Sequence, residues 1–314
     1  METKKRTALN RIPILAVLGP TASHKSNIAG ELATRLNGEI INADSRQIYK
    51  FCTVGTSSPS TFLIRSIPHH LYNFLEPDLR YSAAEYAKIA FEKINCIHEN
   101  GKLSIVVGGS GLYIKALLEG LFNAPGQNVH VRSALKEIAM LMGSDFLHKQ
   151  LQIIDPPSAH KILKNDLFRI IRAIEIFYLT GKSKSYLIKK QQPHKIFKIL
   201  KIGIEIQKAE LCKKIEQRVD AMIACGLIEE VQLLTEHYDP CCPVLNSIGY
   251  KELIPYLQGT ISLAEAICII KRNTKRYAKR QLTWFKKDNA IIWKSPEECL
   301  APSFIDFIKN SLLD

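Results

Sequence analysis

The segment GPTASHKS, residues 19–26, comes close to a phosphate-binding loop, whose pattern is Gly, four residues, Gly, Lys, then Ser or Thr. We call it the phosphate loop. Gly19, Lys25 and Ser26 fit the pattern, whereas His24 stands at the second glycine position. In such a loop, backbone N–H groups point into one concavity at a helix N-terminus, where the dipole favours anions. Lys25 would add a positive charge at the phosphates, and the Ser26 hydroxyl would bind Mg²⁺.

The imperfect loop alone is weak evidence, because a Ser/Thr-rich turn after an apolar strand explains it about equally well. Its surroundings favour the phosphate-loop interpretation. The apolar run at 14–19 predicts a strand that ends at the loop, and the amphipathic stretch at 25–35 predicts the helix that follows.

Strands and helices are expected to alternate before about residue 122 and again from residue 196. Further strands are predicted at 39–44, 103–109, 196–206 and 289–294, and helices at 81–100, with Ser82 as N-cap, and at 112–120. This alternation predicts an α/β fold with a central parallel sheet covered by helices on both faces.

The pattern changes after about residue 122, from where mostly helical segments and no convincing strand extend to 193. We therefore expect a catalytic core formed by 1–121 and 196–314, interrupted by a helical insertion at 122–195. Long helices are expected to fill most of 208–287.

Composition excludes several classes of protein. No run of about 18 apolar residues is present, so a membrane span is not expected. The charged start lacks a signal-peptide-like apolar stretch, which favours a cytoplasmic protein. The eight cysteines contain no CxxC pair, so we expect reduced thiols and no zinc-finger tail. A monomer is the default expectation.

The net charge of +13 favours a polyanionic partner. Six cations recur in pairs at i, i+4 and i+8 of one predicted helix, namely Lys271, Arg272, Lys275, Arg276, Lys279 and Arg280. Like charges four residues apart destabilise a helix, so an anionic partner would explain the stripe. The alternative is a solvated face paired with acids elsewhere. Seven lysines between Lys182 and Lys201 form a second basic run.

Two further residues are candidates for chemistry. Asp44 ends the second predicted strand, where a carboxylate can act as a general base or a metal ligand, although a simple turn aspartate fits equally. Arg218 lies on a predicted helix and matters only if that helix faces the phosphate loop. The strand 103–109 ends in glycines without the acid that many ATPases use, which argues against ATP hydrolysis.

These pieces in this order resemble the tRNA dimethylallyltransferase family, which prenylates an adenosine beside the anticodon. The resemblance covers nearly the whole chain and includes GPTASHKS, INADSRQIYK, VVGGSGLYIKALLEGL, NDLFRIIRAIEIFYLTGKSKS, KKIEQRVDAMIACGLIEEV and NTKRYAKRQLTWF. It implies a P-loop NTPase-like core, a helical insertion that grips the anticodon stem-loop, and a loop that holds dimethylallyl diphosphate rather than ATP. It also implies Mg²⁺ as cofactor.

The resemblance assigns roles to individual residues. Asp44 would be the general base on the adenine amine, with Arg218 and Lys25 at the diphosphate. The diphosphate would lie on Gly19, Pro20, Thr21, Ala22, Ser23, His24, Lys25 and Ser26, with Ser26 on the metal. The tRNA would contact Asp44, Ser45, Arg46, Gln47, Ser110, Arg132, Phe168, Arg169, Ile170, Ile171 and Arg172, and the basic stripe would add Lys275, Lys279 and Arg280.

The sequence departs from the family at a few positions: His24 replaces glycine, Ser58 lysine, Phe168 a frequent glutamine and Lys275 an arginine. The His24 departure leaves a second hypothesis open, a tRNA-binding protein of the same fold with weakened catalysis. A third hypothesis is a small-molecule enzyme, such as a nucleotide kinase or a prenyltransferase for free adenine nucleotides. The basic insertion and stripe argue against it, because a free nucleotide needs no such surface.

Overall fold

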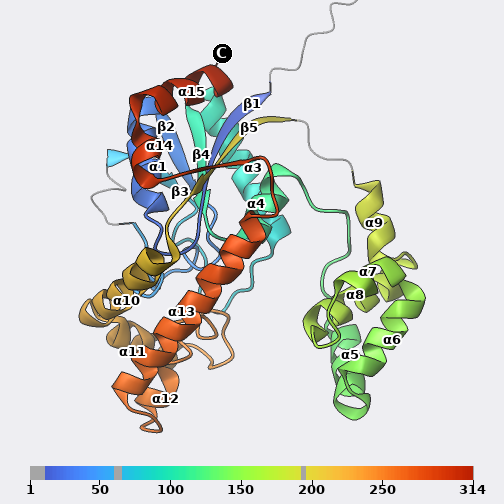
Figure 1. Ribbon diagram of the computed structural model, residues 1–314. Coiled ribbons are helices and arrows are strands. Elements are labelled where there is room, and N and C mark those ends of the chain that lie inside the picture. The colour runs from blue at the N-terminus through green and yellow to red at the C-terminus, as the bar shows by residue number, and fades with distance from the viewer. Residues whose placement is uncertain (1–10, 60–65, 192–195, 314) are drawn as a thin grey trace, which may run out of the picture. The chain divides into compact units, whose positions relative to one another are not determined.

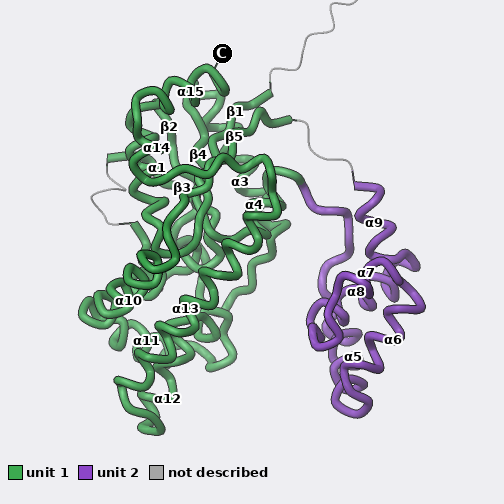
Figure 2. The backbone as a smooth tube through the Cα atoms, in the orientation of Figure 1, with its two compact units in different colours: residues 1–119, 194–314 green, residues 120–193 purple. Residues whose placement is uncertain are grey.

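The computed structural model describes residues 11–59, 66–191 and 196–313. The chain forms two compact units (Figure 2): unit 1 comprises Met1–Glu119 and His194–Asp314, and unit 2 comprises Gly120–Pro193. Unit 2 falls close to the insertion expected at 122–195. Each unit is described by itself below.

Unit 1 contains a sheet of six strands in the order β3-β2-β4-β1-β5-β6, and every neighbouring pair is parallel (Figure 1). The strands are β1 (Ile12–Leu18), β2 (Gly38–Asn42), β3 (His69–His70), β4 (Leu103–Gly108), β5 (Phe197–Ile204) and β6 (Ile291–Lys294). The predicted α/β fold is confirmed. Strand β3 was not predicted, because two residues carry no recognisable periodicity.

Helices α1 (Lys25–Leu36), α14 (Pro296–Leu300) and α15 (Pro302–Leu312) pack against one face of the sheet, and α3 (Ala83–Glu99) and α4 (Gly111–Leu118) pack against the other (Figure 1). The remaining helices of unit 1 lie beyond one end of the strands (Figure 1), namely α10 (Lys208–Ala224), α11 (Leu227–His237), α12 (Ile254–Leu257) and α13 (Leu263–Phe285). Apolar side chains of α1, α14 and α15 pack with alternate sheet residues such as Leu15 and Val17. Helices α3 and α4 pack together and stack Tyr86 on Tyr113, with ring centroids 4.3 Å apart.

Local signals in the sequence fix where helices begin. The Ser82 hydroxyl accepts the Glu85 N–H at 3.2 Å, and the Glu85 carboxylate accepts the Ser82 N–H at 2.7 Å, which confirms the predicted N-cap of α3. Ser262 caps α13 by accepting the N–H of Glu265. The capping side chains therefore determine where these two helices begin.

The strand order places the site. Strand β1 lies between β4 and β5 in the sheet. After β1 the chain continues to β2, on the far side of β4, and a later segment forms β5 on the other side of β1. Leu18 pairs with Gly108, so the two strands end at one level. In such sheets ligands bind beyond the carboxyl ends of the strands, where the strand order reverses. The phosphate loop, Asp44 and the glycines after β4 all follow these strand ends.

Unit 2 is helical throughout its described elements, as expected for the insertion. It contains α5 (Val129–Met142), α6 (Ser144–Ile154), α7 (Pro156–Lys161), α8 (Leu167–Thr180) and α9 (Lys184–Lys190). Its own apolar core includes Leu135, Leu147, Leu151, Ile170 and Ile174. Across the described parts of both units, every helix is too short or too polar to span a bilayer.

Candidate active site

The phosphate loop joins β1 to α1 and is closed by its own polar groups. The Ser23 hydroxyl donates to the Pro20 carbonyl at 2.8 Å, and the Lys25 ammonium donates to the same carbonyl at 3.2 Å. Ala22 and His24 have positive φ angles of 62° and 61°. This left-handed backbone costs a residue with a side chain about 1–2 kcal/mol. Glycine would be free of that strain at position 24, which gives a physical reason for the glycine in the usual motif.

The His24 imidazole is exposed to solvent and lines a cavity beside the loop. Partial burial, assisted by the nearby Lys214 ammonium, lowers the pKa of His24 below its usual value. The ring is therefore mostly neutral at pH 7. Histidine is also among the side chains enriched at positive φ, so the loop keeps its shape despite the substitution.

This cavity, of about 640 Å³, has three walls: the phosphate loop, α10 and a segment that we call the pocket loop, residues 53–59. Arg218 of α10 therefore faces the phosphate loop, as a role for Arg218 at the diphosphate requires. The cavity is lined by Ala22, Ser23, His24, Lys25, Ser26, Asn27, Ser57, Ser58, Pro59, Lys214, Gln217 and Arg218. Another cavity, of about 740 Å³, includes Pro13 and Leu103 at the opposite end of β1 and β4 and contains none of the predicted site residues.

Two cations and one carboxylate influence one another at this site. Burial lowers the pKa of Lys25 to about 8, an effect that Asp44 opposes and Arg218 reinforces. Burial also lowers the pKa of Arg218, and Asp44 again opposes it. Arg218 donates from Nη2 to the Thr56 carbonyl at 3.1 Å, and its other N–H groups make no hydrogen bond within the described part of the chain. They remain able to bind an anion.

Asp44 follows β2 and is held in a side-chain turn. Its N–H donates to Oδ1 of Asn42 at 2.9 Å, and its own Oδ1 accepts the N–H of Arg46 at 2.9 Å. Such turns orient the carboxylate through the local backbone. The side chain is half-buried. Among the described residues, its hydrogen bond is made by Oδ1, and Oδ2 accepts none. A carboxylate with one fixed and one unengaged oxygen suits a base.

Ser110 links the loop after β4 to the loop after β2. Its Oγ accepts the N–H of Ser45 at 2.9 Å and donates to the Ser45 hydroxyl at 3.2 Å. Tyr277 of α13 lies close to Ser110, and burial raises the pKa of that phenol. Asp44 adds to this rise, so Tyr277 lies within electrostatic reach of the carboxylate. Three segments that are distant in sequence thus meet around Asp44.

Gln281 is a site residue that the sequence reasoning missed. Its amide nitrogen donates to the Gly109 carbonyl at 2.9 Å, and its oxygen accepts the Thr21 N–H at 2.8 Å. A Cβ built on Gly109 would lie 2.2 Å from this amide, so glycine permits the close approach of α13. The available signal was a polar residue among apolar positions, since Ala278 and Phe285 lie buried on the same helix.

The basic stripe of α13 divides into two sets. Lys271 pairs with Asp220 at 2.6 Å and Lys275 with Glu216, so these two lysines bind α10. For these two lysines the alternative of a basic face paired with acids elsewhere applies, because α10 packs along one side of α13. The others are exposed and form no ion pair with a described residue, namely Arg272, Arg276, Lys279 and Arg280.

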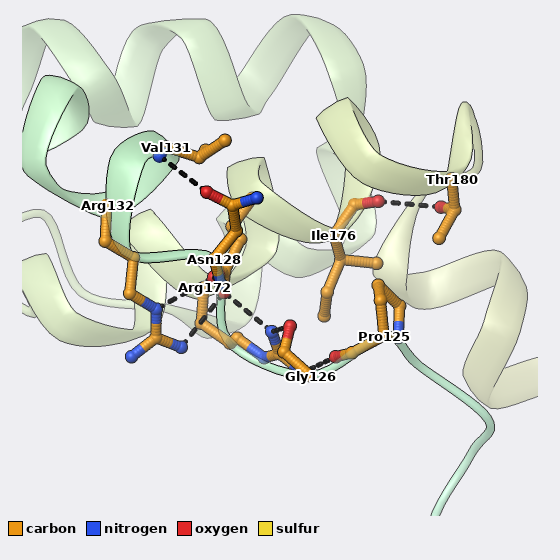
Figure 3. Close-up of polar contacts among 9 residues, drawn as sticks. Pro125, Gly126, Asn128, Val131, Arg132, Arg172, Ile176 and Thr180 are labelled. Atoms are coloured by element: carbon orange, nitrogen blue, oxygen red, sulfur yellow. Dashed lines mark hydrogen bonds and ion pairs between the residues drawn. The ribbon is translucent and has the colours of Figure 1, made fainter.

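In unit 2, a buried carboxylate gathers two of the predicted tRNA-binding arginines. Glu175 is fully buried and accepts hydrogen bonds from Nε and Nη2 of Arg132, both at 2.9 Å, and from Nη1 of Arg172 at 2.6 Å. It also accepts the Asn128 N–H, while Arg172 donates to the Pro125 carbonyl. Figure 3 shows the two arginines converging beside Asn128. The arginines therefore brace the segment that precedes α5.

The rest of the predicted stretch at the start of α8 is divided between surface and core. Phe168 is 71% exposed, and the Cζ atom of Arg132 lies 5.7 Å from the centroid of its ring. Arg169 is exposed and forms an ion pair with Asp166. The side chains of Ile170 and Ile171 are instead buried in the core of unit 2. Helical periodicity causes this: five consecutive residues cannot share one face.

Similarity to known proteins now identifies the chain's relatives. The family model described as IPP transferase matches residues 47–288. The chain is 44% identical to the tRNA dimethylallyltransferase of Geobacter sulfurreducens over 289 residues, covering 90% of this chain and 92% of that protein. It is 40% identical to that of Moorella thermoacetica, covering 98% of each.

The chain belongs to the IPP transferase family. Solved structures agree: the tRNA isopentenylpyrophosphate transferase of Bacillus halodurans matches with a TM-score of 0.70 and 34% identity, covering 96% of this chain and 97% of that one. A eukaryotic dimethylallyltransferase acting on tRNA matches with a TM-score of 0.80 and 28% identity, covering 95% of this chain and 80% of that one. The family predicted from the sequence is confirmed. An IPP transferase that carries His24 in its phosphate loop still has the family's fold.

Proposed function

We propose that the protein transfers a dimethylallyl group from dimethylallyl diphosphate to the exocyclic N6 of the adenosine beside the anticodon of tRNA, releasing diphosphate. The observation that carries this proposal is the cavity in which the phosphate loop faces Arg218, with Asp44 in electrostatic reach of Lys25 and Arg218. The names of the relatives support the donor and the acceptor.

The diphosphate would lie in this cavity, on the phosphate loop. Lys25 and the unengaged N–H groups of Arg218 would neutralise the negative charge that develops as the C1–O bond of the donor breaks. Backbone N–H groups at the start of α1 would add to this. Fixed donors of this kind accelerate the reaction because they are oriented before the charge appears.

Mg²⁺ fits the site only together with the substrate. Ser26 lines the cavity and offers one hydroxyl, and no group of three or more His, Cys, Asp or Glu among the described residues could hold a metal by itself. Mg²⁺ commonly takes one or two protein ligands and completes its shell with water and substrate phosphates. When bound, it would supply additional charge neutralisation at the diphosphate.

Asp44 is the base in this proposal. The N6 amine is a poor nucleophile because its lone pair is delocalised into the adenine ring, so loss of its proton must accompany formation of the N–C bond. The Asp44 carboxylate would accept that proton. Ser45, Arg46, Gln47 and Ser110 would hold the nucleotide beside it, since the Ser45–Ser110 contacts fix the two loops together.

The tRNA supplies a target that can leave its stack. An adenosine in an unpaired anticodon loop is extruded at lower cost than a paired base. In unit 1, the exposed Lys279 and Arg280 are the proposed phosphate contacts, with Lys275 engaged by Glu216. In unit 2, the proposed tRNA contacts are Arg132, Phe168, Arg169 and Arg172. A monomeric, cytoplasmic enzyme remains the expectation.

The second candidate function is tRNA binding with weakened catalysis, and the positive φ of His24 is the observation that favours it. Incubation of the protein with unmodified tRNA, Mg²⁺ and dimethylallyl diphosphate decides between the two. The proposed function predicts tRNA that is heavier by one prenyl group in mass spectrometry. Unmodified tRNA that nonetheless binds with ordinary affinity would support the second candidate.

A further inference from the structure

A single carboxylate holds the pocket loop. Glu230, in the first turn of α11, accepts the N–H groups of Thr53 and Val54 on Oε2, both at 2.8 Å. Its Oε1 accepts the N–H of Gly55 at 2.8 Å and the hydroxyl of Tyr250 at 2.7 Å. Three consecutive backbone N–H groups thus converge on one anion, a nest geometry in which each donor depends on the charge.

The opposite side of the same loop faces the proposed active site. Arg218 donates to the Thr56 carbonyl at 3.1 Å, and Nε2 of Gln47 donates to the carbonyls of Thr56 and Ser57, both at 3.1 Å. The Thr56 carbonyl therefore joins Arg218, proposed at the diphosphate, to Gln47, proposed at the nucleotide. Ser57 also lines the cavity itself.

We infer that Glu230 is a positioning residue for the prenyl donor: it fixes the pocket loop, and through the Thr56 carbonyl it sets the direction of the Arg218 guanidinium. This inference rests on the proposed function. Glu230 points at backbone N–H groups rather than into the cavity, so it touches no substrate. Its role is to hold the wall against which the diphosphate binds.

The contacts explain why a carboxylate is required. Both oxygens of Glu230 accept, whereas a glutamine would accept with one oxygen and turn an NH₂ group toward N–H donors. The loop also has no room to shift toward Tyr250, because a Cβ on Gly55 would lie 2.5 Å from the Tyr250 hydroxyl oxygen. A glutamine would therefore leave one or two of the three N–H groups unsatisfied, and the loop would move.

The experiment compares Glu230→Gln with Glu229→Gln. Glu229 is the neighbouring, exposed glutamate in the same first turn of α11, so the control removes the same charge from the same helix end. In Glu230→Gln we expect the KM for dimethylallyl diphosphate to rise about fivefold or more and the KM for tRNA to rise less, because the loop reaches the nucleotide only through Gln47. Glu229→Gln should match wild type. Calorimetric binding of inorganic diphosphate with Mg²⁺ should weaken in Glu230→Gln by a similar factor.

Three results would overturn the inference: an unchanged KM for the donor, an equal change in Glu229→Gln, or an equally large rise in the KM for tRNA. If Glu230→Gln does not fold, Gly55→Ala displaces the same loop by its Cβ, and an unchanged donor KM in that variant has the same consequence. Wild-type protein that transfers no prenyl group refutes the proposed function instead. In that case the calorimetric affinity for inorganic diphosphate, compared between Glu230→Gln and wild type, still tests the role of Glu230.

Discussion

The side-chain oxygen of Gln281 accepts the backbone N–H of Thr21 at 2.8 Å, while its amide nitrogen donates to the Gly109 carbonyl. One buried side chain of α13 thereby ties the phosphate loop to the turn after β4. Gln281→Leu removes both bonds and leaves two polar backbone groups unsatisfied, at a cost of about 1–3 kcal/mol each. We expect a lower unfolding temperature and a higher KM for dimethylallyl diphosphate. Gln232→Leu, on the surface of α11, is the control, and equal effects in both variants would contradict the assignment.

His24 offers a test that separates backbone from side chain. His24→Ala removes the ring but keeps the strain of positive φ, whereas His24→Gly removes both. If the ring crowds the diphosphate, both variants should bind dimethylallyl diphosphate more tightly than wild type. If backbone strain is the only cost, only His24→Gly should be more stable than wild type. Its free energy of unfolding should rise by about 1 kcal/mol or less, because glycine also increases the entropy of the unfolded chain. Donor KM and thermal unfolding distinguish these outcomes, and wild-type values in both variants would contradict each.

Asp44→Asn should lower kcat by about 10²–10⁴-fold, since an amide cannot accept the proton. Its oxygen can still accept the N–H of Arg46, so the turn that orients the loop is retained. The affinity for tRNA in a binding assay should therefore stay within about twofold of wild type. Asp44→Ala loses the turn as well and should weaken tRNA binding more. Wild-type turnover in Asp44→Asn would refute its role as base.

Glu175→Gln tests the bracing of unit 2. Burial tends to raise the pKa of Glu175, but hydrogen bonds from Arg132 and Arg172 outweigh it and hold that pKa below the usual value. The stability that this carboxylate contributes is therefore present above about pH 4.3 and is lost as pH falls below it. We expect the variant to be destabilised at pH 7 by about 3–5 kcal/mol or less and to bind tRNA more weakly. Exposed Glu137→Gln is the control, and equal tRNA affinities in the two variants would contradict the prediction.

The two sets of cations on α13 should differ in their response to salt. Lys279→Gln removes an exposed, unpaired charge and should reduce the slope of log K against log salt for tRNA binding by about 0.7–1. Lys271→Gln removes a lysine already paired with Asp220, so its slope should change less. Titrations at several salt concentrations measure both. An unchanged slope for Lys279→Gln would remove this residue from the tRNA interface.

The sequence determined much of the fold because the signals involved are local. Apolar runs of β1, β2, β4 and β5 predicted the strands, and Ser82 with Glu85 determined where α3 begins. Lys25 and Ser26 begin the helix that follows β1, and Asp44 stands two residues after β2, so a parallel sheet brings them to one edge without further information. Two-residue strand β3 was beyond this reasoning, because it is defined only by pairing with β2.

Tertiary structure alone decided which polar groups are engaged. The sequence presents six equivalent cations on α13, but only packing against α10 shows that Lys271 and Lys275 are paired. Gln281, Glu230 and Glu175 each bond backbone or side chains distant in sequence, and no spacing rule connects them. The physical reason is that local signals report backbone preferences, whereas a polar group's partner depends on how separate elements pack. The sequence thus determined the fold and the chemical groups at the site, and the tertiary structure decided which groups hold the site in place.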